Sequence, residues 1–494
     1  MERGFNTGKD TANDTAWRDS ASAHQEKNSH HIPSQTGEHT PTFKNLDVDL
    51  SEMANIQLEK IYKNIVNRVE FSLGYPINQK FDFSAFAPFL NLHLNNVGDP
   101  YAANSLLLNT HAQEQEVLEY FGKLWHAESR IPLTGESFWG YILGMGATEG
   151  NMYALWSARE YFQSRLISGD SNRKTTRHPV LYFSQESHYS IEKCAKILNI
   201  ATFQETGNRY YAGRCPITAS GHWPQGVPVN EDGAVDPGLL CELVDFFAKN
   251  GHPPIILLNA GTTFQGAFDD PLVIWQKLSH ILEQHDFSAQ TESESGVDCW
   301  IHIDGALGAA YLPYLEMAYQ QKWVDEKGPG FDFRLPFVNS IVMSSHKWYG
   351  APIASGVYMS KEKYRMQPAT HPEYIDSPDT TLCGSRNGIS ALLLWYAITT
   401  VTPSKQAEIA AGCVKLAAYA YDLLETVTVI HPSFRVKRGP HSLVVLFTRP
   451  QNEIFNKFQL SGRGESAHIV VMPHVTRSAI DSLVSALREP GAFS

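Results

Sequence analysis

The chain of 494 residues contains six cysteines, and no two of them are spaced as a CxxC pair. Scattered thiols of this kind fit reduced, buried side chains and provide neither a disulfide framework nor a zinc site. Basic residues are also few, because 40 Lys and Arg stand against 52 Asp and Glu and give a net charge of −12. The sequence therefore predicts no metal and no nucleic-acid partner, and it favours chemistry on a small molecule.

Long apolar runs are missing as well. No run approaches the roughly 18 residues that a membrane span needs, and the polar N-terminus lacks the apolar core of a secretory signal. We therefore expect no membrane partner and a cytoplasmic location. Hydrophobic residues still make up 43% of the chain, which is enough for a large globular body of more than one domain.

The chain divides into four regions by its pattern of apolar and polar residues. Residues 1–44 are polar and predict a disordered tail. Residues 45–110 begin with a helical pattern and continue through turns rich in Gly, Pro and Asn, which indicates a segment that wraps around the rest. Residues 111–400 alternate helical patterns with short apolar runs, which predicts a large α/β domain with a mostly parallel central sheet. Residues 401–494 predict a small α+β domain. The polar stretch 288–297 is expected to be an exposed loop.

Two reactive side chains follow apolar runs of the predicted sheet. The run "CWIHIDGA" places Asp304 at the end of one strand, and "SIVMSSHK" places Lys347 just after another. The carboxyl ends of parallel strands meet at one edge of a sheet, so we expect the acid and the amine to lie near each other. A simple salt bridge at this edge is the alternative explanation.

Three further motifs follow neighbouring strands. The glycine-rich turn in "WGYILGMGATEGNMYAL" directs backbone N–H groups and a helix N-terminus toward an anion such as a phosphate. Its residues 144–146 begin like a dinucleotide fingerprint, but the later glycines are out of place. His188 either caps a helix or lays its ring on a planar cofactor. Thr262 and Thr263 offer hydroxyls to a ring substituent or a carboxylate, or they serve only to form a turn.

One ligand matches all of these groups. It needs an anion for the glycine turn, a flat ring beside His188, a ring cation for Asp304 and a carbonyl for Lys347, and pyridoxal 5'-phosphate has each of these parts. The aromatic residues around Lys347 hinder its hydration and so favour the neutral amine that attacks a carbonyl. The sequence therefore predicts a pyridoxal-phosphate enzyme.

The motifs "GATEGN", "ESHYS", "NAGTTFQGAFDD", "HIDGALGAAYLPY", "SSHKWYGAP", "GSRNG" and "AHIVVMPHV" stand in the order found in group II pyridoxal-phosphate decarboxylases. The chain most resembles their histidine and serine decarboxylase branch. This resemblance implies fold type I, the aspartate aminotransferase superfold, in a homodimer with active sites at the subunit interface. It also implies an amino-acid decarboxylase that releases a primary amine and carbon dioxide, with L-histidine as the leading substrate.

The same resemblance implies a role for individual residues. Lys347 would hold the cofactor as a Schiff base, Asp304 would pair with its pyridine nitrogen, and His188 would stack on its ring. The other residues around the cofactor would be Ala147, Thr148, Thr262, Thr263, Ala306, Ser344 and His346. The residues at the substrate mouth would be Tyr75, Asn78, Asn95, Asn96 and Ile389. Tyr374, in a polar loop after the lysine, would donate the final proton.

One position departs from the branch and leaves the substrate open. Ile389 stands after "SRNG", where the serine and histidine branch has a histidine. An isoleucine offers apolar contact and no hydrogen bond, so an aliphatic amino acid such as valine or leucine is an alternative substrate if Ile389 lines the pocket and does not pack behind it. Serine is a further alternative, which the resemblance implies. An aminotransferase or a carbon–carbon lyase would share Lys347 and Asp304 but release a different product. A binding protein without catalysis is the third alternative.

Overall fold

The computed structural model describes residues 50–167, 177–291, 294–366 and 372–493, so the predicted tail lies outside the described residues. Contacts divide the chain into two units at Lys63 and Asn64. The helix expected near the N-terminus is present as α1 (Leu50–Val69). Among the helices of the described residues, none is both long enough and apolar enough to cross a membrane.

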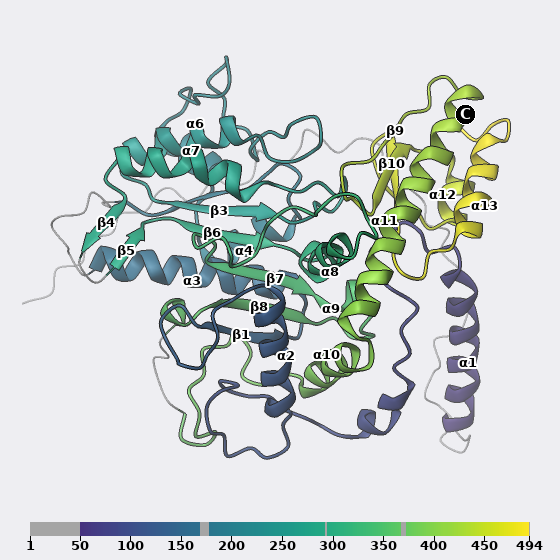
Figure 1. Ribbon diagram of the computed structural model, residues 1–494, viewed down its shortest axis with the longest axis horizontal. Helices are drawn as coiled ribbons and strands as arrows, with labels where there is room; N and C mark the ends of the chain where they lie inside the picture. Colours follow the sequence, from purple (N-terminus) through teal and green to yellow (C-terminus); the bar gives the residue numbers. More distant parts are fainter. Residues whose placement is uncertain (1–49, 168–176, 292–293, 367–371, 494) are drawn as a thin grey trace, which may run out of the picture. The chain divides into compact units, whose positions relative to one another are not determined.

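The second unit contains the other elements, which Figure 1 labels. Its α-helices are α2 (His111–Leu124), α3 (Ala147–Ile167), α4 (Ser190–Leu198), α5 (Phe203–Tyr210), α6 (Pro237–Lys249), α7 (Pro271–Gln284), α8 (Gly308–Gln320), α9 (Ser345–Trp348), α10 (Gly388–Thr400), α11 (Pro403–Glu425), α12 (Asn452–Lys457) and α13 (Arg477–Arg488). Its 3₁₀ helices are η1 (Ser84–Asn91), η2 (Glu362–Tyr364) and η3 (Thr426–Val429). Its strands are β1 (Phe138–Leu143), β2 (Val180–Tyr182), β3 (Pro254–Asn259), β4 (Ser288–Thr291), β5 (Glu294–Val297), β6 (Trp300–Asp304), β7 (Ser340–Ser344), β8 (Gly356–Lys361), β9 (Val436–Lys437), β10 (Val444–Thr448), β11 (Ser461–Arg463) and β12 (Ser466–Val470).

The central sheet has the strand order β1-β8-β7-β6-β3-β2. Strands β2, β3, β6 and β7 pair in parallel, whereas β8 is antiparallel to both of its neighbours. The apolar runs seen in the sequence form these strands, which confirms a mostly parallel α/β sheet. The parallel strands end at the same edge, and the reactive residues follow there.

Helices cover both faces of this sheet, and strand β3 shows how the sequence directs them. Successive side chains of a strand point to opposite faces. Ile255 and Leu257 accordingly pack in a core with residues of α3 and α4, while Ile256 and Leu258 pack in a second core with residues of α6, α7 and α8. Figure 1 shows α6 and α7 on one side of the sheet and α3 on the other. A strand buried on both faces must be apolar throughout, as this run is.

The C-terminal part forms the smaller sheet. Its strands lie in the order β11-β12-β10-β9, all antiparallel, and α11 and α13 pack near it. This arrangement is the α+β region predicted from the sequence. The first strand residue of β10, Val444, pairs with Val470 at the end of β12, and this pair recurs in the site below.

Local signals in the sequence fix where several helices begin. Asp236 and Asp270 each accept hydrogen bonds from the first turn of the following helix, α6 or α7, and a proline stands at the first helical position in both. Such capping satisfies N–H groups that have no partner inside the helix. At α5, Thr202 and Glu205 form a capping box.

The polar stretch 288–297 was expected to be a loop, and this expectation is wrong. It forms an antiparallel pair of short strands, β4 and β5, with Ser288 opposite Val297. Backbone pairing between strands needs no apolar side chains, so the composition of the stretch did not reveal it.

Candidate active site

A cavity lies at the edge where the strands of the central sheet end. It collects residues that follow β1, β2, β3, β6 and β7, together with residues of the smaller sheet. The lining residues are Pro76, Met145, Ala147, Thr148, Asn151, His188, Ser190, Asn259, Gly261, Thr263, Asp304, Ala306, Leu307, Ser344, His346, Lys347, Val444 and Val470. Segments far apart in the sequence therefore contribute to one site.

Lys347 lies in the short helix α9, immediately after β7. Its ammonium forms no hydrogen bond or ion pair with any residue that the structure describes. Burial lowers the pKa of Lys347, and the nearby Asp304 carboxylate only partly opposes this effect. Since burial disfavours the charged form, a larger share of this lysine is neutral and nucleophilic than of an exposed lysine.

The turn that carries Lys347 is held by the N-terminal segment. The backbone N–H of Asn78 donates to the carbonyl of Lys347 at 2.9 Å, and the Asn78 side chain donates to the carbonyl of Trp348 at 2.9 Å. The indole of Trp348 in turn donates to Gln406 at 3.0 Å. Asn78 thus fixes the backbone around the lysine, although its side chain does not line the cavity.

Asp304 ends β6 and is buried. Its Oδ1 accepts the backbone N–H of Ala306 at 3.1 Å, and its Oδ2 accepts the side-chain N–H of Asn151 at 2.8 Å. Two donors therefore set the orientation of the carboxylate. Its position in the cavity wall leaves it facing any ligand bound there.

His188 contacts the start of a helix and also lines the cavity. Its Nδ1 accepts the backbone N–H of Ser190 at 3.3 Å and lies 2.8 Å from the Ser190 hydroxyl, so the ring caps the start of α4. The same ring lines the cavity. Burial lowers the pKa of His188, with Lys347 acting in the same direction and Asp304 opposing. A neutral ring is the form suited to lie against a flat, cationic cofactor ring.

The glycine turn differs in one respect from what its sequence suggested. The backbone N–H groups of Gly144 and Met145 both donate to Glu149 Oε2 at 2.8 Å, so a side chain of α3 already uses them. Glu149 does not use the end of the turn, where Ala147 and Thr148 begin α3. There the Ala147 N–H donates to the Ser344 hydroxyl at 3.0 Å.

The residues present fit pyridoxal phosphate. Gly146 has a φ of +69°, and a Cβ on it would lie 2.6 Å from His346 Cε1 and 3.2 Å from the Ser344 hydroxyl. The absence of that Cβ lets a helix N-terminus and a hydroxyl converge, as a phosphate requires. The same cavity supplies an acid, an amine and an imidazole for the ring nitrogen, the carbonyl and the ring face of the cofactor.

The structure gives different positions to Thr262 and Thr263, which were both predicted to lie at the cofactor. Thr263 lines the cavity, and so do Ala306 and His346. Thr262 does not, because its hydroxyl accepts the N–H of Ala267 at 3.0 Å inside the turn after β3. Thr262 thus has the turn-forming role that the sequence left open.

The predicted substrate residues are less well gathered. Tyr75, Asn95, Asn96 and Ile389 are absent from the wall of this cavity, whose described lining includes only Pro76 from the N-terminal segment. Tyr374 is 80% exposed and is also outside the wall. Within one chain, the structure therefore does not bring these side chains to Lys347.

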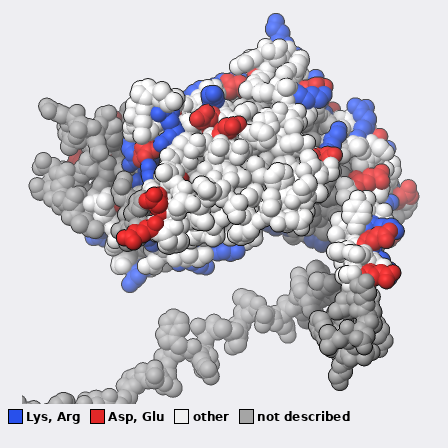
Figure 2. Space-filling view, turned by 90° about the horizontal axis from the view of Figure 1, so that it is seen from below, with Lys and Arg blue, Asp and Glu red and all other residues white. Residues whose placement is uncertain are grey.

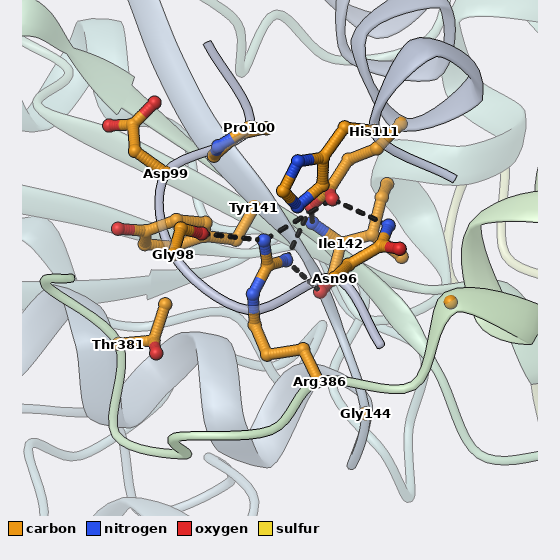
Figure 3. Close-up of polar contacts among 12 residues, drawn as sticks. Asn96, Gly98, Asp99, Pro100, His111, Tyr141, Ile142, Gly144, Thr381 and Arg386 are labelled. Carbon is orange, nitrogen blue, oxygen red and sulfur yellow. Dashed lines mark hydrogen bonds and ion pairs between the residues drawn. The ribbon is translucent and has the colours of Figure 1, made fainter. Parts of the chain in front are cut away.

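Asn96 instead belongs to a buried polar network around Arg386 and Glu114 (Figure 3). The Arg386 guanidinium pairs with the Glu114 carboxylate and donates to the carbonyl of Gly98 at 3.0 Å. Glu114 also accepts the Asn96 side-chain N–H at 2.8 Å and the Ile142 backbone N–H at 3.0 Å.

Burial opposes the charge of Arg386, but the pairing with Glu114 outweighs it and raises the pKa of Arg386. Removing one partner of such a buried pair generally costs about 3–5 kcal/mol of folding free energy, because a charge is left without compensation. The network thereby joins the N-terminal segment, α2, β1 and the "GSRNG" motif into one framework.

Sequence reasoning missed several residues of the cavity wall. Asn151 and Asn259 are buried amides, and Val444 and Val470 come from the smaller sheet. Asn151 follows the glycine turn at the spacing of one helical turn from Ala147, which places it on the same side of α3. The two valines gave no signal, because an apolar strand residue is typical of any core.

The chain is similar to known proteins in both sequence and structure. Residues 86–431 match the family described as the pyridoxal-dependent decarboxylase conserved domain. Serine decarboxylase 2 of Oryza sativa subsp. japonica is 32% identical over 86% of this chain and 76% of its own length. Histidine decarboxylase of Acinetobacter baumannii (strain ACICU) is 30% identical over 88% of this chain and 95% of its own length. The crystal structure of L-methionine decarboxylase from Streptomyces sp. 590 matches with a TM-score of 0.81 and 35% identity, over 91% of this chain and 98% of that one.

Proposed function

The chain belongs to the pyridoxal-dependent decarboxylase family, and from that premise we propose that its substrate is an L-amino acid with an uncharged, largely apolar side chain. It is a pyridoxal-phosphate-dependent carboxy-lyase of fold type I. The three relatives act, by their names, on serine, histidine and methionine. Our choice among such substrates depends on which side chains line the cavity.

The observation that supports an apolar substrate is the uneven lining of the cavity. Its apolar residues include Pro76, Met145, Leu307 and the facing pair Val444 and Val470. Some of its polar side chains already have partners elsewhere in the chain: the Asn259 side chain, for example, donates to Ser187 and Asp269. An imidazole or hydroxyl placed against the valines would find no partner there, which disfavours such groups.

The roles of the chain's own residues follow from their positions. Pyridoxal phosphate, when bound, supplies an electron-accepting ring that takes up the electron pair left when carbon dioxide departs. Lys347 would offer its amine to hold the cofactor, and Asp304 would stabilise a positive charge at the ring nitrogen. His188 would lie against the ring, and Ser344, Thr148 and the start of α3 would bind the phosphate.

Relative turnover of different amino acids tests the substrate proposal. We expect kcat/KM for L-methionine and L-leucine to exceed that for L-histidine and L-serine by about 10-fold, the amount one or two well-placed apolar groups contribute. Val444→Ala should reduce kcat/KM for L-methionine by a similar factor and leave L-serine nearly unchanged. Amine release with L-glutamate is the control for a charged side chain.

The competing expectation from the sequence is L-histidine, the substrate in the name of the Acinetobacter relative. If L-histidine is turned over best and Val444→Ala does not alter the ranking, the apolar wall does not select the substrate and the proposal is wrong. Release of a keto acid in place of an amine would instead indicate transamination.

We further propose that two copies of the chain form a homodimer, as the resemblance implied. Large apolar side chains of the N-terminal segment are strongly exposed, including Leu90 at 70%, Leu107 at 87% and Leu108 at 71%. Figure 2 shows a face with few charged residues across its centre. Surfaces of this kind usually bind another protein. In a dimer, Tyr374 and Ile389 of one chain could contribute to the active site of its partner. Light scattering that shows the mass of a single chain at micromolar concentration would contradict the dimer.

A further inference from the structure

A line of three hydrogen bonds runs through the core to Asp304. His302 Nδ1 lies 2.8 Å from the Ser340 hydroxyl, and His302 Nε2 lies 2.9 Å from Asn151 Oδ1. The Asn151 Nδ2 group then donates to Asp304 Oδ2 at 2.8 Å. All four side chains are buried, and His302 is completely shielded from solvent.

The placement of these groups follows from the strand period. His302 and Asp304 are two residues apart on β6, so they point to the same face of the sheet. Helix α3 packs against β6, and it brings Asn151 between the two side chains. The segment "HID" therefore places His302 and Asp304 on the face of the sheet that α3 covers.

The direction of each hydrogen bond can be assigned. An ionised Asp304 only accepts, so Asn151 presents its NH₂ group to Asp304 and its carbonyl oxygen to His302. His302 Nε2 must then carry a hydrogen. Burial lowers the pKa of His302 to about 4, so the ring is neutral near pH 7 and its Nδ1 accepts the Ser340 hydroxyl at 2.8 Å, with the Ser340 carbonyl oxygen farther away at 3.2 Å. The opposite tautomer would let Nδ1 donate to that carbonyl but would set Nε2 against Asn151 Oδ1 at the shorter distance of 2.9 Å.

We propose that Asn151 and His302 are positioning residues that hold the Asp304 carboxylate toward the ring nitrogen of the cofactor. The proposal rests on the assignment of Asp304 to that nitrogen. His302 prevents the Asn151 amide from turning over, and Asn151 therefore always presents a donor to Asp304. A reversed amide would direct an oxygen at the carboxylate and push it from its place. Fixed groups of this kind are effective because they need no rearrangement when the ligand binds.

Variants of His302 separate this role from simple packing. His302→Gln keeps an N–H donor near the position of Nε2, whereas His302→Phe fills the space without a donor. We expect His302→Phe to raise the dissociation constant of pyridoxal phosphate about 10-fold, because an Asn151 amide that is free to turn over no longer keeps its hydrogen bond to the charged Asp304. It should also shift the visible absorption band of the holoenzyme. His302→Gln should stay within about 2-fold of the wild type, with an unchanged band.

A buried histidine elsewhere provides the matched control. His252 is buried and bonded to the carbonyl of His178 at 2.9 Å, and it does not line the cavity. His252→Phe should lower the melting temperature without changing the cofactor affinity or spectrum. If His302→Phe folds poorly, Asn151→Leu tests the same bond to Asp304, with the same 10-fold expectation.

The outcomes for these variants separate the possible roles. Equal behaviour of His302→Gln and His302→Phe would overturn the positioning role, as would an unchanged cofactor affinity in Asn151→Leu. Rescue by glutamine alone supports it. Asp304→Asn distinguishes this proposal from the assignment of Asp304 to the ring nitrogen. If that variant changes neither the cofactor affinity nor the spectrum, the assignment of Asp304 itself is wrong. If Asp304→Asn changes both and the other variants change neither, only the positioning role fails.

Discussion

Lys347→Ala is expected to abolish decarboxylation, with a loss in kcat on the order of 10⁴-fold or more. No other amine was found to line the cavity among the described residues, so nothing replaces the group that holds the cofactor. The variant should fail to retain the cofactor after treatment with borohydride, whereas the wild type should gain its mass in a covalent link to the peptide that contains Lys347. Mass spectrometry of the digested protein measures both results.

Lys361 supplies the control for this experiment. Lys361 is buried, and burial lowers its pKa as it lowers that of Lys347, but its ammonium donates to the carbonyl of Pro336 at 2.8 Å and pairs with Glu136 at 3.0 Å. Lys361→Ala should therefore lose stability and keep the covalent link. A borohydride-stable link that persists in Lys347→Ala would show that another residue carries the cofactor.

Asp304→Asn is expected to reduce kcat by about 10²–10³-fold. An amide has one acceptor oxygen, whereas two donors, the Ala306 N–H and the Asn151 NH₂ group, approach the two oxygens of Asp304. In either orientation of the new amide, its NH₂ group faces one of these two N–H donors. It also no longer holds a positive charge at the ring nitrogen. Steady-state amine release at saturating cofactor measures the loss.

Asp332 tests whether burial of a carboxylate alone explains such a loss. It is buried and pairs with Arg334 at 2.7 Å, at a site outside the cavity. Asp332→Asn should reduce the free energy of unfolding and leave the specific activity of the folded enzyme near that of the wild type. A rate for Asp304→Asn within a few-fold of the wild type would remove Asp304 from the reaction.

The sequence was most informative where topology alone determines position. Asp304 and Lys347 follow neighbouring parallel strands, and the ends of such strands must meet, so their proximity could be foreseen without any knowledge of side-chain packing. The same argument applies to the glycine turn, because β1 points in the same direction as β7.

The sequence was least informative where a polar group has a choice of partners. Asn95 and Asn96 were predicted at the substrate mouth, yet Asn95 bonds to Ser385 and Asn96 to Glu114. Asn95 and Ser385 are 290 residues apart in the sequence, and Asn96 and Glu114 are 18 residues apart. No local pattern in the sequence distinguishes an amide that binds a ligand from one that binds another part of the chain. Glu149 is a similar case, since its use of the N–H groups in the glycine turn depends on a rotamer.

The buried pair of Arg386 and Glu114 has a consequence for attempts to redesign substrate preference by grafting. An engineer who exchanged residues 75–110 for those of another family member would transplant Asn96 and Gly98 without the carboxylate and guanidinium that they contact. Such a chimera would leave charges without hydrogen-bond partners in the interior. The modular unit for recombination is therefore the segment together with the start of α2 and the "GSRNG" motif, and a graft with those boundaries should yield soluble enzyme where the shorter graft does not.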